Sequence, residues 1–115
     1  MANEPIRLGR IKTIVQKALN WKGDIDPNVY YLPEDLDALA AKYPDTYLRK
    51  VEEIHNILKD PDFASGDENK VILFRTYYHE RKFVTVGIAL ERHEKWLCKG
   101  FTNLKAQEAD AFRLR

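Results

Sequence analysis

The stretch that decides the fold expected of this 115-residue chain is KVILFRTYYHERKFVTVGIALERHEKWLCKGFT, residues 70–102. Three runs rich in β-branched and aromatic residues are separated here by two short polar turns. Connections this short predict antiparallel hairpins. The predicted strands are Lys70–Tyr78, Lys82–Leu90 and Lys95–Thr102.

The middle predicted strand alternates between larger and smaller side chains. The larger set is predicted to face a layer of helices, and it comprises Val84, Val86, Ile88 and Leu90. On the strand before it, the set predicted to share this core face comprises Ile72, Phe74 and Thr76. That choice sends Arg75 and Tyr77 to the opposite, open face of the sheet.

The third predicted strand has two alternative inward faces. Either Trp96 and Cys98 or Leu97 and Phe101 are buried, and the pattern does not decide between them. If Trp96 faces inward, Lys99 comes to lie on the open face.

The first part of the chain predicts helices. A first helix is expected over Arg7–Asn20, because apolar residues recur there at steps of three and four. A second is expected to begin at Pro33, since proline suits the first turn of a helix. It is expected to end at Tyr43, because the residue before a proline avoids the helical region.

Further elements are expected on either side of the second helix and in the last part of the chain. A short strand at a sheet edge, or an extended entry, is expected at Val29–Leu32, and a polar loop at Ala64–Asn69. The face of a third helix is predicted by Tyr47, Val51, Ile54, His55 and Leu58, and this helix is expected to end at Asp60-Pro61-Asp62. A final helix is expected over Leu104–Leu114.

These elements predict one α+β domain that spans residues 1–115. Its N-terminal helices are expected to pack on a C-terminal antiparallel sheet of three to four strands, with a short C-terminal helix.

The composition is that of a globular protein. Hydrophobic residues make up 44% and charged residues 32% of the chain, which argues against intrinsic disorder. No apolar run approaches the roughly 20 residues that a membrane-spanning helix needs. The N-terminus lacks the apolar stretch of a secretory signal, so a cytoplasmic protein without a membrane partner is expected.

Charge is segregated along the chain although the net charge is only +1. Residues 1–22 carry five Lys or Arg and one acid (net +4), residues 23–69 carry four and twelve (net −8), and residues 70–115 carry ten and five (net +5). This pattern suggests a basic face that could attract a phosphate backbone. Packing of oppositely charged elements against each other would produce the same pattern.

The sequence predicts neither a metal site nor a cofactor. His55, His79 and His93 lack the spacing of metal ligands. Cys98, in the middle of a predicted strand, is expected to be a packed apolar residue rather than a nucleophile. On the apolar face of its helix, His55 is predicted to be partly buried and hydrogen-bonded, with a catalytic base as the alternative.

One set of side chains could converge on the open face of the predicted sheet. Arg75 and Lys99 would hold a scissile RNA phosphate, because cations stabilise the charge that grows on its oxygens. Tyr43 and Thr102 would orient that phosphate, and His55 would be a reserve base. The residues predicted to bind substrate beside them are Tyr77, Lys82 and Thr85. Solvent-exposed strand residues that pair across the sheet are the alternative interpretation.

Several local matches occur in order along the chain. They are GRIKTIVQKALN (9–20), YLPEDLDALAAKYPDTY (31–47), VEEIHNILKDPDF (51–63) and WLCKGFTN (96–103). From about residue 7 onward the chain thereby resembles a prophage-associated branch of the Barnase–EndoU–colicin–RelE-like (BECR) nuclease superfamily. The resemblance implies that superfamily's α+β fold. It also implies kinship with toxins and phage-borne ribonucleases that cleave RNA without a metal.

Two positions depart from the pattern of that branch. Tyr43 precedes Pro44 where the branch tends to have His, and Gly100 precedes Phe101 where it tends to have Thr. The resemblance therefore supports the fold more than the activity.

Three functional hypotheses follow. The first is a metal-independent endoribonuclease or a diverged relative, from a prophage or toxin-type locus and acting on RNA such as tRNA. The second is a non-catalytic module on the same fold that binds RNA or a protein, such as an inhibitor. The third is an interaction protein that uses the acidic residues 23–69 to meet a basic partner.

Overall fold

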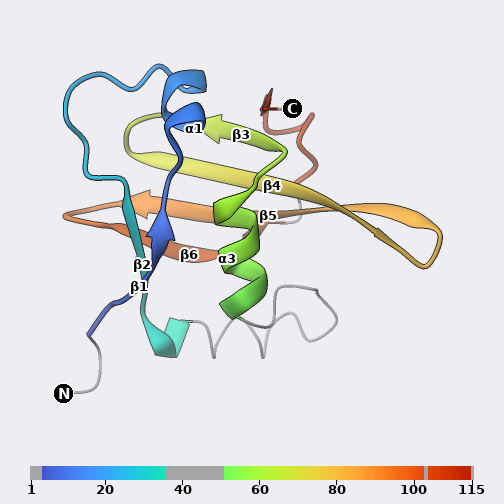
Figure 1. Cartoon of the computed structure of the whole chain (residues 1–115), viewed down its shortest axis with the longest axis horizontal. Helices are drawn as coiled ribbons and strands as arrows, with labels where there is room; N and C mark the ends of the chain where they lie inside the picture. The colour runs from blue at the N-terminus through green and yellow to red at the C-terminus, as the bar shows by residue number, and fades with distance from the viewer. Residues whose placement is uncertain (1–3, 36–50, 103, 115) are drawn as a thin grey trace.

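The chain is built on one mixed seven-stranded sheet, shown in Figure 1 for the computed structural model. The structure describes residues 4–35, 51–102 and 104–114. The strands are β1 (Ile6–Arg10), β2 (Asn28–Tyr31), β3 (Phe63–Gly66), β4 (Lys70–His79), β5 (Lys82–Arg92), β6 (Trp96–Thr102) and β7 (Phe112–Arg113). The helices are α1 (Thr13–Ala18) and α3 (Val51–Lys59), and residues 33–35 are also helical. The strand order is β1-β2-β6-β5-β4-β3-β7.

The predicted layer of N-terminal helices on a C-terminal sheet is wrong. The segment expected as one helix over Arg7–Asn20 is strand β1 followed by the six-residue helix α1. Leu8, Ile11 and Val15 are all buried in the same core, so their helix-like spacing arises from a strand, a bend and a helix in succession. Apolar spacing alone does not distinguish these two arrangements over so short a stretch.

Strand β2 joins the N-terminal elements to the rest of the sheet. It confirms the short strand expected after residue 28, but β2 is not at an edge: it pairs antiparallel with β1 and parallel with β6. The parallel pair makes the sheet mixed, which the hairpin pattern of the last third did not predict.

Two predictions are wrong, one for the segment before the hairpins and one for the segment after them. Part of the expected loop at Ala64–Asn69 belongs to β3, where Ala64 is fully buried and pairs with Leu73 of β4 and Phe112 of β7. The expected last helix is a turn-rich segment that ends in β7.

The two predicted hairpins, β4–β5 and β5–β6, are confirmed. In β5, Val86, Ile88 and Leu90 belong to the core, as expected. The face predicted for β4 is wrong, because Leu73 lies opposite Ile88 in the core. Phe74 is fully buried, but on the other face of the sheet, where it pairs with Gly87.

The turn between β4 and β5 explains that error. His79 pairs with Lys82, which leaves a two-residue turn, Glu80–Arg81, with φ of 49° and 66°. Positive φ at both central residues is typical of the type I′ turn, whose twist matches that of a hairpin. The polar residues 79–81 predict a three-residue turn instead, and a register change of one residue moves every side chain of a strand to the other face.

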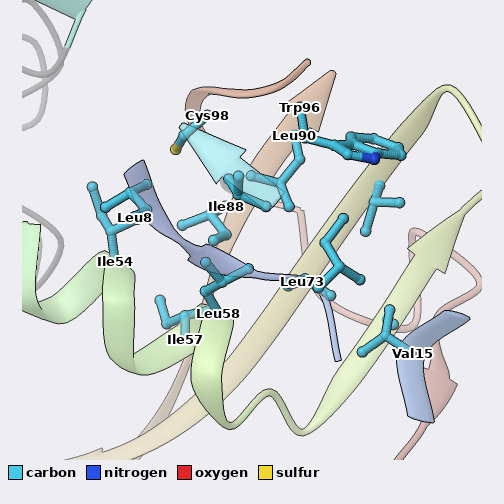
Figure 2. Packing of buried hydrophobic residues seen from close by; sticks show 14 of the residues in the cluster. Leu8, Val15, Ile54, Ile57, Leu58, Leu73, Ile88, Leu90, Trp96 and Cys98 are labelled. Atoms are coloured by element: carbon cyan, nitrogen blue, oxygen red, sulfur yellow. The ribbon is translucent and has the colours of Figure 1, made fainter. Parts of the chain in front are cut away.

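The main core lies between the sheet and helix α3 (Figure 2). Leu8 of β1 belongs to this core together with Ile54 and Leu58 of α3, and Trp96 and Cys98 of β6 are fully buried. Of the two alternative inward faces of β6, the one with Trp96 and Cys98 is therefore correct.

A stacked pair of indole rings joins the segment after α1 to β6. The ring of Trp21 stacks on that of Trp96 with centroids 5.3 Å apart. Stacked aromatic pairs contribute on the order of 1 kcal/mol beyond their buried area.

Replacing Gly66 by Ala should destabilise the fold strongly. Gly66 has φ of +119°, and a Cβ there would overlap the Lys70 backbone and lie 2.9 Å from Val71 Cα. We expect a loss of at least about 2 kcal/mol in the free energy of unfolding, measured by urea denaturation.

Gly23→Ala is the matched control for Gly66→Ala. Gly23 also has a positive φ, +79°, but a Cβ there would meet nothing within 4 Å. The destabilisation should therefore stay near about 1 kcal/mol. Equal destabilisation at the two positions would contradict the steric argument.

Candidate functional site

Arg75 does not lie on the open face. It follows Leu73 on the α3 side of β4, where its Nη1 donates to the carbonyl oxygens of Asn56 (3.3 Å) and Asp60 (3.4 Å). It also forms an ion pair with the Asp60 carboxylate at 3.6 Å. Because the C-terminal end of a helix carries a partial negative charge, the Arg75 guanidinium stabilises this end of α3, where the Asn56 carbonyl also accepts from the Asp60 amide. The predicted orientation of Arg75 is therefore wrong.

Lys99 lies too far from Arg75 to share a phosphate with it. Lys99 is exposed at an irregularity in the β5–β6 pairing, beside Ala89 and Leu90, whereas Arg75 pairs with Val86. The two positions are two strands apart, about 10 Å, and also about 10 Å apart along the strands. The predicted phosphate site between them does not form.

Tyr43, the fourth member of the predicted cluster, lies outside the described residues. Thr102 is on the open face at the end of β6, next to Gly87, and its Oγ1 accepts a hydrogen bond from the Leu104 amide at 3.1 Å. The role in catalysis assigned to Thr102 stays a prediction.

The residues predicted to bind substrate are on different faces. Half-buried Tyr77 packs against the core, with the Arg75 guanidinium 5.5 Å from its ring centroid. Thr85 is on the open face, where its hydroxyl lies 3.1 Å from that of Thr76. Lys82 is exposed at the tip of the β4–β5 hairpin.

His55 has a more defined setting than the other predicted residues. Its Nδ1 lies 2.7 Å from the carbonyl oxygen of Leu8, which joins α3 to β1. A carbonyl only accepts, so Nδ1 must donate, and Nε2 is the acceptor of the neutral ring. The predicted hydrogen bond is confirmed, although the residue is exposed rather than partly buried.

Gly9 makes this contact possible. A Cβ at position 9 would lie 3.1 Å from Leu58 Cδ2 and 3.7 Å from two atoms of the His55 ring. The missing side chain therefore lets α3 approach β1 closely enough for the ring to reach the Leu8 carbonyl.

A groove of about 300 Å³ opens beside this contact, between β1 and α3. We call it the basic groove, and its lining residues are Arg7, Gly9, Arg10, Lys12, His55, Leu58 and Lys59. Figure 1 shows α3 beside β1, the edge strand of the sheet.

The basic groove carries a one-sided charge. All four of its Lys and Arg residues are exposed, and no Asp or Glu is among its described lining residues. Arg7 bonds to the Asn28 side chain through Nε at 3.1 Å. Among the residues whose side chains the structure describes, none forms an ion pair with Arg10, Lys12 or Lys59. Such a concentration of cations attracts phosphate groups.

The sequence held one signal for this groove. Three of its four cations come from residues 1–22, the segment with net charge +4. The proximity of that segment to Lys59 and His55 was missed, because the segment was expected to form a helix and not a strand beside α3.

Metal ligation has no candidate in the part of the chain that the structure describes, where no three His, Cys, Asp or Glu side chains are grouped. Over the same residues, no helix has the length and apolar character needed to cross a membrane.

Comparisons with protein-family models, with curated proteins and with solved structures give no match to this chain. The resemblance to the BECR superfamily therefore stays a prediction from the sequence.

The Cys98 thiol should be unreactive in the folded protein. Cys98 is fully buried, as expected, and burial raises its pKa to about 12. Because the thiolate is the reactive form, we expect no reaction with Ellman's reagent at pH 8 until the chain is unfolded. One equivalent of thiol should then appear in denaturant. Rapid modification of the native protein would contradict this burial.

Proposed function

We propose that this chain binds RNA by holding phosphate groups in the basic groove. The observation that supports this most strongly is the set of four exposed cations around one cavity with no described acidic neighbour in its lining. A cavity of about 300 Å³ is small for a ligand site. We therefore expect it to hold a single phosphate with its ribose, rather than a duplex.

A single strand suits this geometry better than a double helix. Neighbouring phosphates of an extended strand could follow the exposed edge strand β1, from which Arg7 and Arg10 project. RNA is also the substrate class that the BECR resemblance implies. A protein partner for the acidic residues 23–69 stays a prediction, since much of that segment lies outside the described residues.

Salt dependence tests the phosphate interaction. The affinity for a fluorescent single-stranded RNA of about 12 nucleotides should fall steeply between about 50 and 200 mM salt. Replacing Arg10, Lys12 and Lys59 together by Ala should weaken binding at low salt. It should also reduce the slope of log K against log salt by about 0.7 for each phosphate that the variant no longer neutralises. Fluorescence anisotropy measures both quantities.

A second triple variant controls for the change in net charge. Lys22, Lys70 and Lys99 are exposed and do not line the groove. Replacing these three by Ala removes the same charge and should leave the slope within about 0.5 of the original. Equal weakening of binding in the two triple variants would show that binding is not located in the groove.

RNA cleavage is a second candidate function, favoured by the setting of His55. Its Nε2 could accept the proton of a 2′-hydroxyl, whose oxygen then attacks the adjacent phosphorus. The bond to the 5′-oxygen breaks, that oxygen takes a proton from solvent, and the products are a 2′,3′-cyclic phosphate and a 5′-hydroxyl. The groove cations would stabilise the charge on the phosphorane oxygens.

His55→Asn separates cleavage from binding. The Asn amide can still donate to the Leu8 carbonyl, but it has no basic nitrogen. With tRNA or total RNA in EDTA, the parent protein should give discrete fragments ending in 2′,3′-cyclic phosphate. The variant should cleave at least about 100-fold more slowly and bind RNA within about two-fold of the parent. Intact RNA with the parent protein, despite binding, would leave the chain a binding module only.

A further inference from the structure

The open face of the sheet, opposite α3, carries a second and larger cavity, of about 580 Å³. Its floor is formed by β4 and β5, and its rim by the segment after β6. We call it the open-face hollow. The lining residues used below are Phe63, Thr76, Phe83, Thr85, Lys105 and Gln107.

Hydrogen bonds hold both the floor and the rim of the open-face hollow in place. On the sheet side, the ladder pairs Thr76 with Thr85, whose hydroxyls lie 3.1 Å apart. On the other side, the Ser65 hydroxyl donates to the Ala109 carbonyl at 2.6 Å, and the Leu114 amide donates to the Asp62 carbonyl at 2.9 Å. These bonds fasten the C-terminal segment to the neighbourhood of β3.

One side of the hollow offers an aromatic surface to solvent. Phe83 is 77% exposed, and it pairs across the hairpin with Tyr78, which is 66% exposed. Their ring centroids are 5.1 Å apart with the rings tilted by 56°. Tyr78 does not line the hollow, so of these two rings only that of Phe83 is available to a ligand there. Large aromatic rings left this exposed are typical of binding surfaces.

The polar groups of the hollow differ from those of the basic groove. Thr hydroxyls and the Gln107 amide can each donate and accept hydrogen bonds, while Lys105 adds one cation. Hydroxyl and amide groups beside an exposed ring suit a flat heterocycle with hydrogen-bonding edges. A nearby ammonium suits an attached phosphate.

We propose that the open-face hollow binds one nucleotide. Its base stacks on Phe83, the base edge meets Thr76, Thr85 or Gln107, and its phosphate meets Lys105. This site is on the other face of the sheet from the basic groove, and the proposal does not depend on the function proposed for that groove.

NMR titration of the 15N-labelled chain tests the proposal. The probes are adenosine 5′-monophosphate and uridine 5′-monophosphate, each added to about 10 mM, because a single-nucleotide site is expected to have a Kd near about 1 mM. We expect saturable shifts of the Thr76, Thr85 and Gln107 amides. Phe83→Ala should weaken binding by about five-fold or more, because it removes the ring on which the base stacks.

Two controls make the test specific. Tyr78→Ala removes the neighbouring exposed ring, which does not line the hollow, and should change the affinity by less than about two-fold. Ribose 5-phosphate, which lacks the base, should bind at least about five-fold more weakly than either nucleotide. The spectra also report whether each variant is folded.

Three results would overturn the proposal. The first is the absence of shifts in the hollow with both nucleotides. The second is the confinement of shifts to the basic groove, which would support phosphate binding there alone. The third is equal affinity for ribose 5-phosphate and the nucleotides.

Discussion

The pairing of His79 with Lys82 across a two-residue turn controls the arrangement of both surfaces of this protein. This register places Leu73 against Ile88 in the core and Thr76 beside Thr85 on the open face. It also directs Arg75 to the C-terminal end of α3, where the guanidinium meets two carbonyls and a carboxylate. A shift of one residue would exchange these faces, turning Thr76 towards the core and Leu73 away from it.

The second constraint is the approach of α3 to β1 at Gly9. It lets Leu58 pack beside the strand and the His55 ring reach the Leu8 carbonyl. The same approach brings the cations of an N-terminal strand next to Lys59. Residues that are remote in sequence thus share one groove, and their charge has no described acidic neighbour within it. The shape of the groove and the clustering of its cations therefore both depend on the absence of a side chain at Gly9.

The hairpins and the end of α3 could be predicted, because they depend on local signals. β-Branched runs, short polar turns and the proline after Asp60 act within a few residues of where they stand. The face of β4 could not be predicted, since it depends on whether the turn has two residues or three. Glu80 and Arg81 give no sequence indication of positive φ, which is usually signalled by Asn or Gly.

The N-terminal strands and the candidate site were missed for a different reason. Leu8, Ile11 and Val15 satisfy a helical spacing, and only tertiary pairing with β2 and α3 makes the first of them part of a strand. The charge of residues 1–22 was visible, but its partners Lys59 and His55 come from an element about forty residues later. Such long-range proximity is a property of the sheet order and not of the local pattern.

The parallel contact between β2 and β6 has a thermodynamic consequence for the groove. In the described part of the chain, two residue pairs, Val29 with Trp96 and Tyr30 with Leu97, form this ladder. The stacked indoles and the contact of Lys95 with the Tyr30 ring add to it. Detachment of the β1–β2 unit would dismantle the groove, because β1 forms one of its two walls, and local opening of this kind can cost less free energy than global unfolding. An anion bound between β1 and α3 would then stabilise the docked state of the β1–β2 unit. The stabilisation would rise with the concentration of the anion relative to its Kd.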